Sequence, residues 1–170
     1  MRLLFSLAVF AGCASTTADM PLTVSLGLGR DATTTALRDH QYCHKVDPPQ
    51  KIETYPRCER VGTEWGESWI TAEFAEDNRL VELRRWERFT DDTRAVERWN
   101  QLVIDRNKLV PESDGALQVL RAQGLLQPGT RAVKAFQVDP HTVVGIYLLT
   151  PSAPEQASVL EKIVLVGAGK

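Results

Sequence analysis

The sequence has few of the residue types and motifs that mark catalytic, metal or nucleic-acid sites. It contains three histidines and three cysteines, and 20 basic residues nearly balance 22 acidic ones, for a formal net charge of -2. Without a basic excess there is no electrostatic footprint for DNA or RNA, so we expect no nucleic-acid partner. Gly27 and Gly29 lack the strand, the helix and the third glycine of a dinucleotide site, so we expect no cofactor.

Residues able to act in catalysis are present, but their positions have simpler explanations. His40 and His44 lie on either side of Cys43, and His141 lies in a turn signal. The serines fit turns, caps or exposed helix positions: Ser68, Ser113, Ser152 and Ser158. We therefore expect no enzyme activity. The alternative is an exported hydrolase, which needs His141 or His44 to meet a serine and a carboxylate.

The amino terminus has the layout of an export signal. Arg2 is followed by an apolar run, Leu3 to Ala11, that is too short to span a bilayer. Its end, Phe10-Ala11-Gly12-Cys13, resembles the lipobox of bacterial lipoprotein precursors. That resemblance implies cleavage before Cys13 and acylation of this cysteine, so the lipid bilayer is the first expected partner. Phe10 departs from the usual leucine and leaves ordinary signal peptidase cleavage after Ala14 or Ala18 as an alternative.

This interpretation divides the chain into three parts. Residues 1–12 are expected to be the signal peptide, 13–22 the lipidated cysteine and a tether, and 23–170 a single α+β domain. Ala14 occupies the position where lipoproteins retained in an inner membrane often carry aspartate. We therefore expect the outer membrane of a bacterial envelope, with the domain facing the periplasm or the exterior.

Without Cys13, one pair of cysteines remains. Cys43 and Cys58 are expected to form a disulfide, as in other exported chains, closing a loop through Asp47-Pro48-Pro49 with little secondary structure of its own. The alternative is a metal site that adds His40 and His44. The spacing is not a recognised finger pattern, so we expect no metal.

The strongest periodicity lies between Trp65 and Leu109. Alternating residues over Trp69 to Phe74 predict a strand, Asp77-Asn78 predicts a hairpin turn, and Arg79 to Phe89 predicts the return strand. We expect a bulge near Arg84 and Arg85; helical spacing of Leu80, Leu83 and Trp86 leaves a helix as the alternative.

A helix over Arg94 to Lys108 is expected to cover that sheet. Thr90 is the expected cap and Pro111 the stop. Its inner stripe follows 3.6-residue spacing and comprises Ala95, Val96, Trp99, Leu102, Val103 and Arg106.

The rest of the chain predicts more helices and strands of the same layers. A helix capped by Ser113 or Asp114 ends at Gly124, and strands follow at Arg131 to Val138 and Val143 to Leu149. Ser152 and Glu155 predict a capping box for a last helix containing Ala157 and Leu160, and Ile163 to Val166 an edge or closing strand. The fold class is α+β, an antiparallel sheet of about four to six strands packed against two to four helices.

A second resemblance covers Val24 to Phe89. Leu26-Gly27-Leu28-Gly29 leads into a short helix that includes Asp31 and His40, and the Trp and Phe strands follow. This order resembles the small lipoprotein of the outer-membrane β-barrel assembly machinery and related β-lactamase-inhibitor-like modules. It implies an alternative function as an accessory factor in outer-membrane assembly. The disulfide and the long continuation depart from those modules, and no site residue is carried over.

The tryptophans supply the candidate partner surface. Trp99 and Trp86 are expected in the core, with Trp86 packed beneath the helix of Trp99. Exposed Trp and Arg are favoured at binding centres, so the expected surface comprises Trp65, Trp69, Arg84 and Arg88. We therefore expect a noncatalytic binding or structural role in the envelope, with a protein or glycan as the partner.

Overall fold

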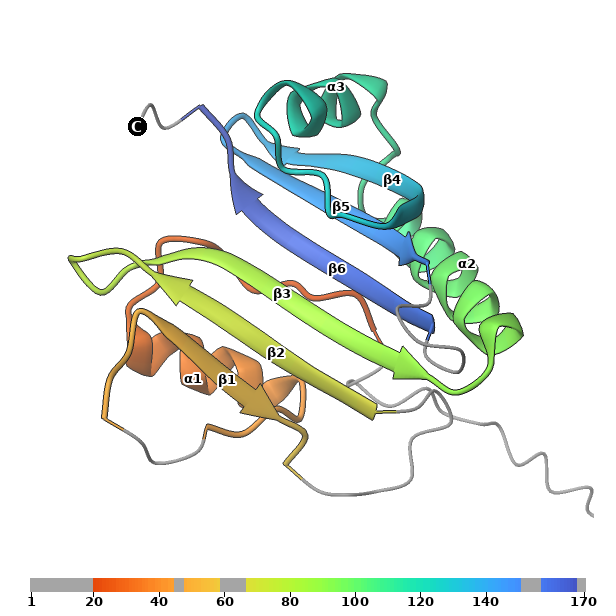
Figure 1. Ribbon diagram of the computed structural model, residues 1–170. Helices are drawn as coiled ribbons and strands as arrows, with labels where there is room; N and C mark the ends of the chain where they lie inside the picture. Colours follow the sequence, from red (N-terminus) through yellow and green to blue (C-terminus); the bar gives the residue numbers. More distant parts are fainter. Residues whose placement is uncertain (1–19, 45–47, 59–66, 151–156, 168–170) are drawn as a thin grey trace, which may run out of the picture.

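The computed structural model describes residues 20–44, 48–58, 67–150 and 157–167. They form one six-stranded antiparallel sheet and three helices, which confirms the α+β fold (Figure 1). The strands are β1 (Ile52–Pro56), β2 (Glu67–Phe74), β3 (Leu80–Phe89), β4 (Thr130–Asp139), β5 (Thr142–Leu149) and β6 (Ala157–Leu165). The helices are α1 (Arg30–Asp39), α2 (Asp92–Leu109) and α3 (Asp114–Ala122).

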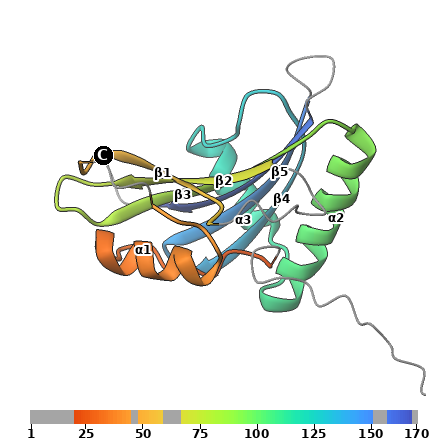
Figure 2. The ribbon, with the colours of Figure 1, turned by 90° about the horizontal axis from the view of Figure 1, so that it is seen from below.

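The sheet consists of two three-stranded meanders that meet at its centre. Its strand order is β1-β2-β3-β6-β5-β4, so the seam between the meanders is the β3–β6 pair. We call the face that α1 and α2 cover the inner face and the face that carries α3 the outer face. Figure 2 shows α1 and α3 on opposite faces of the sheet. Each face has its own apolar cluster, and Leu102 of α2 belongs to the inner one while Leu120 of α3 belongs to the outer one.

Local sequence explains where the first meander turns. Asn78 adopts the left-handed conformation, with φ of 63°, which confirms the predicted hairpin between β2 and β3. The predicted bulge near Arg84 and Arg85 is wrong. The register instead shifts beside the turn. Glu73 faces Glu82 and Phe74 faces Leu80, so β3 has one extra residue, Val81, at this point, and the hairpin accommodates it next to its turn.

Two of the helices begin at side-chain caps. The Asp91 carboxylate accepts from the Thr93 N–H at 2.8 Å, so the cap of α2 is Asp91 and the expectation for Thr90 is wrong. Ser113 caps α3 through the Ala116 N–H, as predicted. Gly124, with φ of 66°, follows α3 in the left-handed conformation that the sequence indicates.

β5 is buried along its whole length, as its apolar run predicts. Tyr147 folds back over Gly145, where a Cβ would lie 2.6 Å from the Tyr147 Cε2 atom. The Tyr147 hydroxyl donates to the Leu125 carbonyl at 3.3 Å beside α3. In the neighbouring strand β4, Phe136 is buried, whereas Val138 is 43% exposed, because the register shifts at the end of the strand.

The last predicted helix is wrong. Ala157 and Leu160 belong to β6. The strand predicted at Ile163 to Val166 is confirmed as the end of β6 up to Leu165, but it lies at the centre of the sheet and not at an edge. Glu161 and Lys162 give this segment the pattern of a helix surface, yet both are buried against partners from other strands and from α2. The Ser152–Glu155 box lies outside the described residues.

The disulfide loop contains structure that the sequence does not indicate. β1 pairs with β2 in register from Ile52 opposite Glu73 to Pro56 opposite Trp69. The expectation of little secondary structure between Cys43 and Cys58 is therefore wrong. Pairing with a strong neighbour overrides the weak propensity of a short segment next to proline.

Candidate functional site

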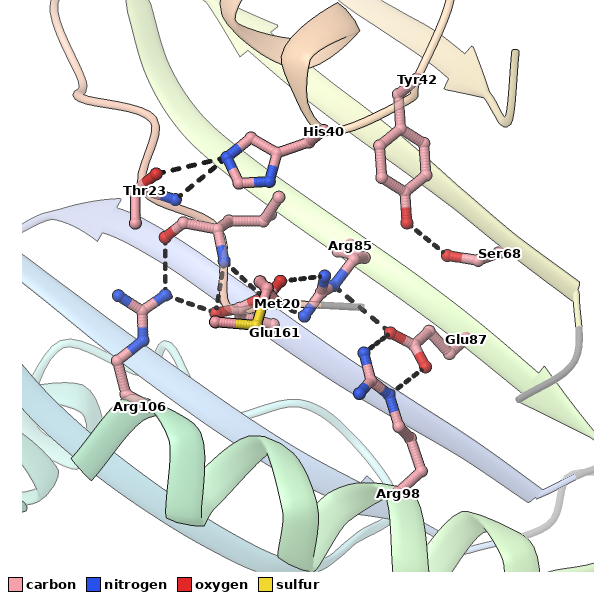
Figure 3. A network of polar contacts seen from close by, with 11 residues as sticks. Met20, Thr23, His40, Tyr42, Ser68, Arg85, Glu87, Arg98, Arg106 and Glu161 are labelled. Atoms are coloured by element: carbon pink, nitrogen blue, oxygen red, sulfur yellow. Dashed lines mark hydrogen bonds and ion pairs between the residues drawn. The ribbon is translucent and has the colours of Figure 1, made fainter. Parts of the chain in front are cut away.

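Five charged side chains form a buried ion network on the inner face (Figure 3). We call it the inner network; its members are Arg85, Glu87, Arg98, Arg106 and Glu161, and none is more than 3% exposed. Arg85 of β3 lies directly opposite Glu161 of β6, and its Nη2 atom is 2.7 Å from Glu161 Oε2. The network therefore ties together the two meanders at their seam.

Helix α2 supplies the other two cations. Arg98 and Arg106 lie two turns apart on its buried side, in line with Leu102. Arg98 binds Glu87 with two nitrogens, Nε to Oε2 at 2.6 Å and Nη2 to Oε1 at 2.8 Å, and Arg106 pairs with Glu161. These charge-assisted bonds fix the helix on the sheet.

The two carboxylates are held in the charged form. Burial alone raises the pKa of Glu87, but the charges of Arg98 and Arg85 outweigh burial and leave that pKa below its ordinary value. Burial likewise raises the pKa of Glu161, and the charges of Arg85 and Arg106 lower it further than burial raises it. Both groups therefore act as permanent anions near neutral pH.

The inner network also binds the backbone at the start of the described chain. The Leu22 N–H lies 3.2 Å from each oxygen of Glu161, and Arg106 Nη2 donates to the Leu22 carbonyl at 2.6 Å. Arg85 Nη1 donates to the Met20 carbonyl at 2.7 Å. Leu22 itself is 0% exposed within the inner apolar cluster. We call Arg85, Arg106 and Glu161 in this role the backbone clamp.

Two further polar contacts border the network in Figure 3. Tyr42 and Ser68 share a hydrogen bond of 2.6 Å, and burial raises the pKa of the Tyr42 hydroxyl. Ser68 is a buried strand residue, so its expected place in a turn, a cap or an exposed helix is wrong. The Nε2 atom of His40 lies 3.3 Å from the Thr23 hydroxyl, directly after the clamped segment.

The predicted disulfide is present between Cys43 and Cys58. It removes both thiols that the alternative metal site required. His44 turns instead to Glu53, with Nε2 3.3 Å from Oε2, and Arg30 pairs with the same carboxylate. Among the described residues, no three His, Cys, Asp or Glu side chains gather as a metal site would require.

The outer face carries the candidate partner surface. Trp69 and Trp86 stack with ring centroids 6.3 Å apart and planes 11° apart, and the Arg88 guanidinium lies 5.1 Å from the Trp69 ring centre. Arg84 lies on the same face, paired with Glu73 and Glu82. The structure thus brings three of the four predicted residues to one face, while Trp65 lies outside the described residues.

The placement of Trp86 under α2 is wrong. It lies opposite Trp69 on the outer face, where it packs against the cluster of α3, because the pleat turns Arg85 rather than Trp86 toward α2. Trp99 does belong to the inner stripe, as predicted, and its indole N–H donates to the Ile146 carbonyl at 3.1 Å.

The inner network does not emerge from the sequence as a unit. The inner stripe predicted from helical spacing includes Arg106 but omits Arg98, although positions 98, 102 and 106 share one side of a helix. This spacing is the feature of the sequence from which Arg98 could have been predicted to be buried with Leu102 and Arg106. Arg85 and Glu161 carry no comparable signal, because they come from strands in different meanders.

The histidines lie apart from one another in the fold. His44 faces Glu53 and His40 faces Thr23, both near β1 and α1. His141 lies in the turn between β4 and β5, where its backbone N–H donates to the Asp139 carboxylate at 2.8 Å. His44 and His141, either of which the alternative hydrolase could use, therefore lie in different parts of the fold.

Within the described ranges, no helix is both long and apolar enough to cross a membrane. The chain matches no protein-family model, no curated protein and no solved structure.

Proposed function

We propose that the protein is a bacterial envelope lipoprotein with a noncatalytic binding or structural role. The observation that carries the proposal is Phe10-Ala11-Gly12-Cys13 at the end of a short apolar run. The Cys43–Cys58 disulfide supports it, because disulfides persist in oxidising compartments outside the cytoplasm. Acylation of Cys13 with several chains would make the attachment to the bilayer effectively permanent, at about 0.8 kcal/mol for each buried methylene.

The anchor is tested by changing one atom. Cys13→Ser removes the acylated sulfur, and we expect the variant to leave the membrane fraction for the soluble fraction. Ala14→Asp is the matched variant that keeps the sulfur, and we expect it to remain lipidated but to move from the outer to the inner membrane on a density gradient. A Cys13→Ser protein that stays with the membrane would refute the anchor.

The partner surface that we propose is the outer face around Trp69, Arg84 and Arg88. Arginine and tryptophan are favoured at binding centres, and the Arg88 side chain is 42% exposed. Trp69→Ala should therefore abolish recovery of an envelope protein or glycan partner while the disulfide and the secondary structure stay intact. Trp99→Ala is the control, because it removes an indole from the inner face. Equal loss of stability in both variants would remove Trp69 as a binding residue.

An accessory role in outer-membrane assembly is the second candidate. It rests on the resemblance of Val24 to Phe89, and the order of a Gly-ended turn, α1 and an antiparallel sheet agrees with it. Co-purification of the wild-type protein with outer-membrane barrels, lost in Trp69→Ala, is the expected result for this candidate. Recovery of a glycan alone would favour a free-standing binder.

A further inference from the structure

The backbone clamp suggests a role for the inner network beyond packing. Buried ion pairs contribute little net stability when apolar side chains of similar volume would fill the same space. Here the charged groups do something that apolar side chains cannot do, because they bond the N–H and C=O of Leu22 and the C=O of Met20. Clamping through main-chain atoms holds the segment whatever the side chain of residue 20 is, and Met20 is 43% exposed.

The clamped segment directly follows the proposed tether. Seven chain steps separate Cys13 from Met20, and a fully extended chain covers at most about 3.6 Å per step, or about 25 Å in all. If the clamp opened, the next backbone bond to the sheet is from the Gly27 N–H to the Leu80 carbonyl, at 2.7 Å. Fourteen steps separate Cys13 from Gly27, so release of the whole segment, with Leu22 and Val24 leaving the inner apolar cluster, would allow about 50 Å.

We infer that the backbone clamp sets the reach of the protein: it holds the sheet at Met20, which the covalent chain keeps within about 25 Å of the acylated residue, so the partner is a component of the membrane surface. This inference rests on the proposed lipid anchor. The clamp joins Met20 and Leu22 to β3, β6 and α2 at once, so a pull on the anchor is resisted by the centre of the fold rather than by a frayed end.

The first measurement tests the clamp without any lipid. In the soluble Cys13→Ser protein, hydrogen exchange at the Leu22 amide should be slow, because that N–H is buried against Glu161. In Glu161→Gln we expect exchange at Leu22 to be accelerated at least about tenfold more than exchange at the β5 amides, which report the global stability. Lys162→Gln is the matched control: Lys162 is the next residue, is also buried, and pairs with Glu82 instead. Fast exchange at Leu22 in the otherwise unchanged protein would overturn the clamp.

The second measurement tests the reach. The lipidated protein, labelled with a donor dye at the exposed position Glu97→Cys, is placed in vesicles of phosphatidylethanolamine and phosphatidylglycerol that carry acceptor dyes on their headgroups. Inserting seven Gly/Ser residues after Asp19 gives the longer tether for calibration. We expect Glu161→Gln to lower energy transfer toward that of the insertion variant and Lys162→Gln to leave it unchanged.

The outcomes separate the two ideas. Equal energy transfer in Glu161→Gln and the starting protein, with Leu22 exchange already accelerated, would overturn the reach inference and leave the anchor intact. Wild-type protein that does not stay on the vesicles would overturn the anchor, and the reach with it, while the exchange of Leu22 would still report on the clamp.

Discussion

Replacing Glu87 tests two properties of the inner network: that water does not reach its charges, and that its ion pairs depend on one another. The Glu87 carboxylate accepts two bonds from Arg98, at 2.6 and 2.8 Å, and lies 3.3 Å from Arg85 Nε. Glu87→Met keeps the volume but removes the anion that both guanidiniums share. Breaking a buried pair by removing one partner costs about 3–5 kcal/mol, and we expect the upper end because two cations are affected.

The complementary change should cost less. Arg98→Met leaves Glu87 with Arg85, so we expect a loss of about 3 kcal/mol in the free energy of unfolding. The double variant Glu87→Met/Arg98→Met removes an opposite pair together, so its loss should be smaller than the sum of the single losses by about 2–3 kcal/mol. Single domains have a total free energy of unfolding of about 5–15 kcal/mol. All three variants therefore stay folded enough for a denaturation curve if the protein lies in the upper part of that range.

The free energies of unfolding of the starting protein, the two single variants and the double variant form a double-mutant cycle. They are measured by urea denaturation at neutral pH, monitored by tryptophan fluorescence and far-UV circular dichroism. The exposed Asp92–Arg131 pair, which also joins α2 to the sheet, is the control, because solvent screens it, and Arg131→Met should change stability little. Single losses below about 1 kcal/mol would show that water reaches Glu87. Strict additivity would show that Glu87 and Arg98 do not act as a pair.

Three further outcomes follow from the same structure. The folded-state pKa values of Glu87 and Glu161 lie below the ordinary value of 4.5. The free energy of unfolding should therefore be highest above about pH 5 and fall as the pH drops through the lowered pKa values. In a series of denaturation curves at acid pH, Glu161→Gln should lose less stability than the starting protein over this range. Cys43→Ala/Cys58→Ala should lower the free energy of unfolding by about 3 kcal/mol, and thiol titration of the unfolded, unreduced protein should find neither sulfur free. Gly145→Ala should cost about 1–3 kcal/mol and alter the near-UV spectrum, because its Cβ would meet the Tyr147 ring at 2.6 Å; an unchanged melting curve would contradict that packing.

The sequence predicts those parts of the fold in which periodicity and burial agree. Alternation over β2, the left-handed Asn78 and the almost wholly apolar run of β5 each follow from local rules. The part of β6 before Ile163 could not be predicted as a strand because Glu161 and Lys162, which are charged, lie at the centre of the sheet, and pattern rules assign such residues to surfaces.

The same limit applies to the candidate sites. Trp69, Arg84 and Arg88 could be grouped because β2 and β3 are adjacent in sequence and the strand pleat fixes their faces. The inner network could not be predicted in this way. No local rule pairs Arg85 with Glu161, which lies in the last strand of the other meander, or brings either residue to the Leu22 backbone. The disulfide was predictable because the expected assignment of Cys13 to the lipid anchor leaves one pair of cysteines, and one pair has one connectivity.

The place of β6 at the seam has a consequence for the order in which the chain can fold. β1, β2 and β3 are complete long before β6 has been made, so the edge of β3 stays unpaired during synthesis. Open edges favour pairing between chains, and charges discourage it. The waiting edge carries Arg84, Arg85, Glu87 and Arg88, and Arg85 and Glu87 lie close enough to neutralise each other within one strand. A chain halted at that stage would present a charged ribbon, and aggregation should be slower than for a typical half-built sheet.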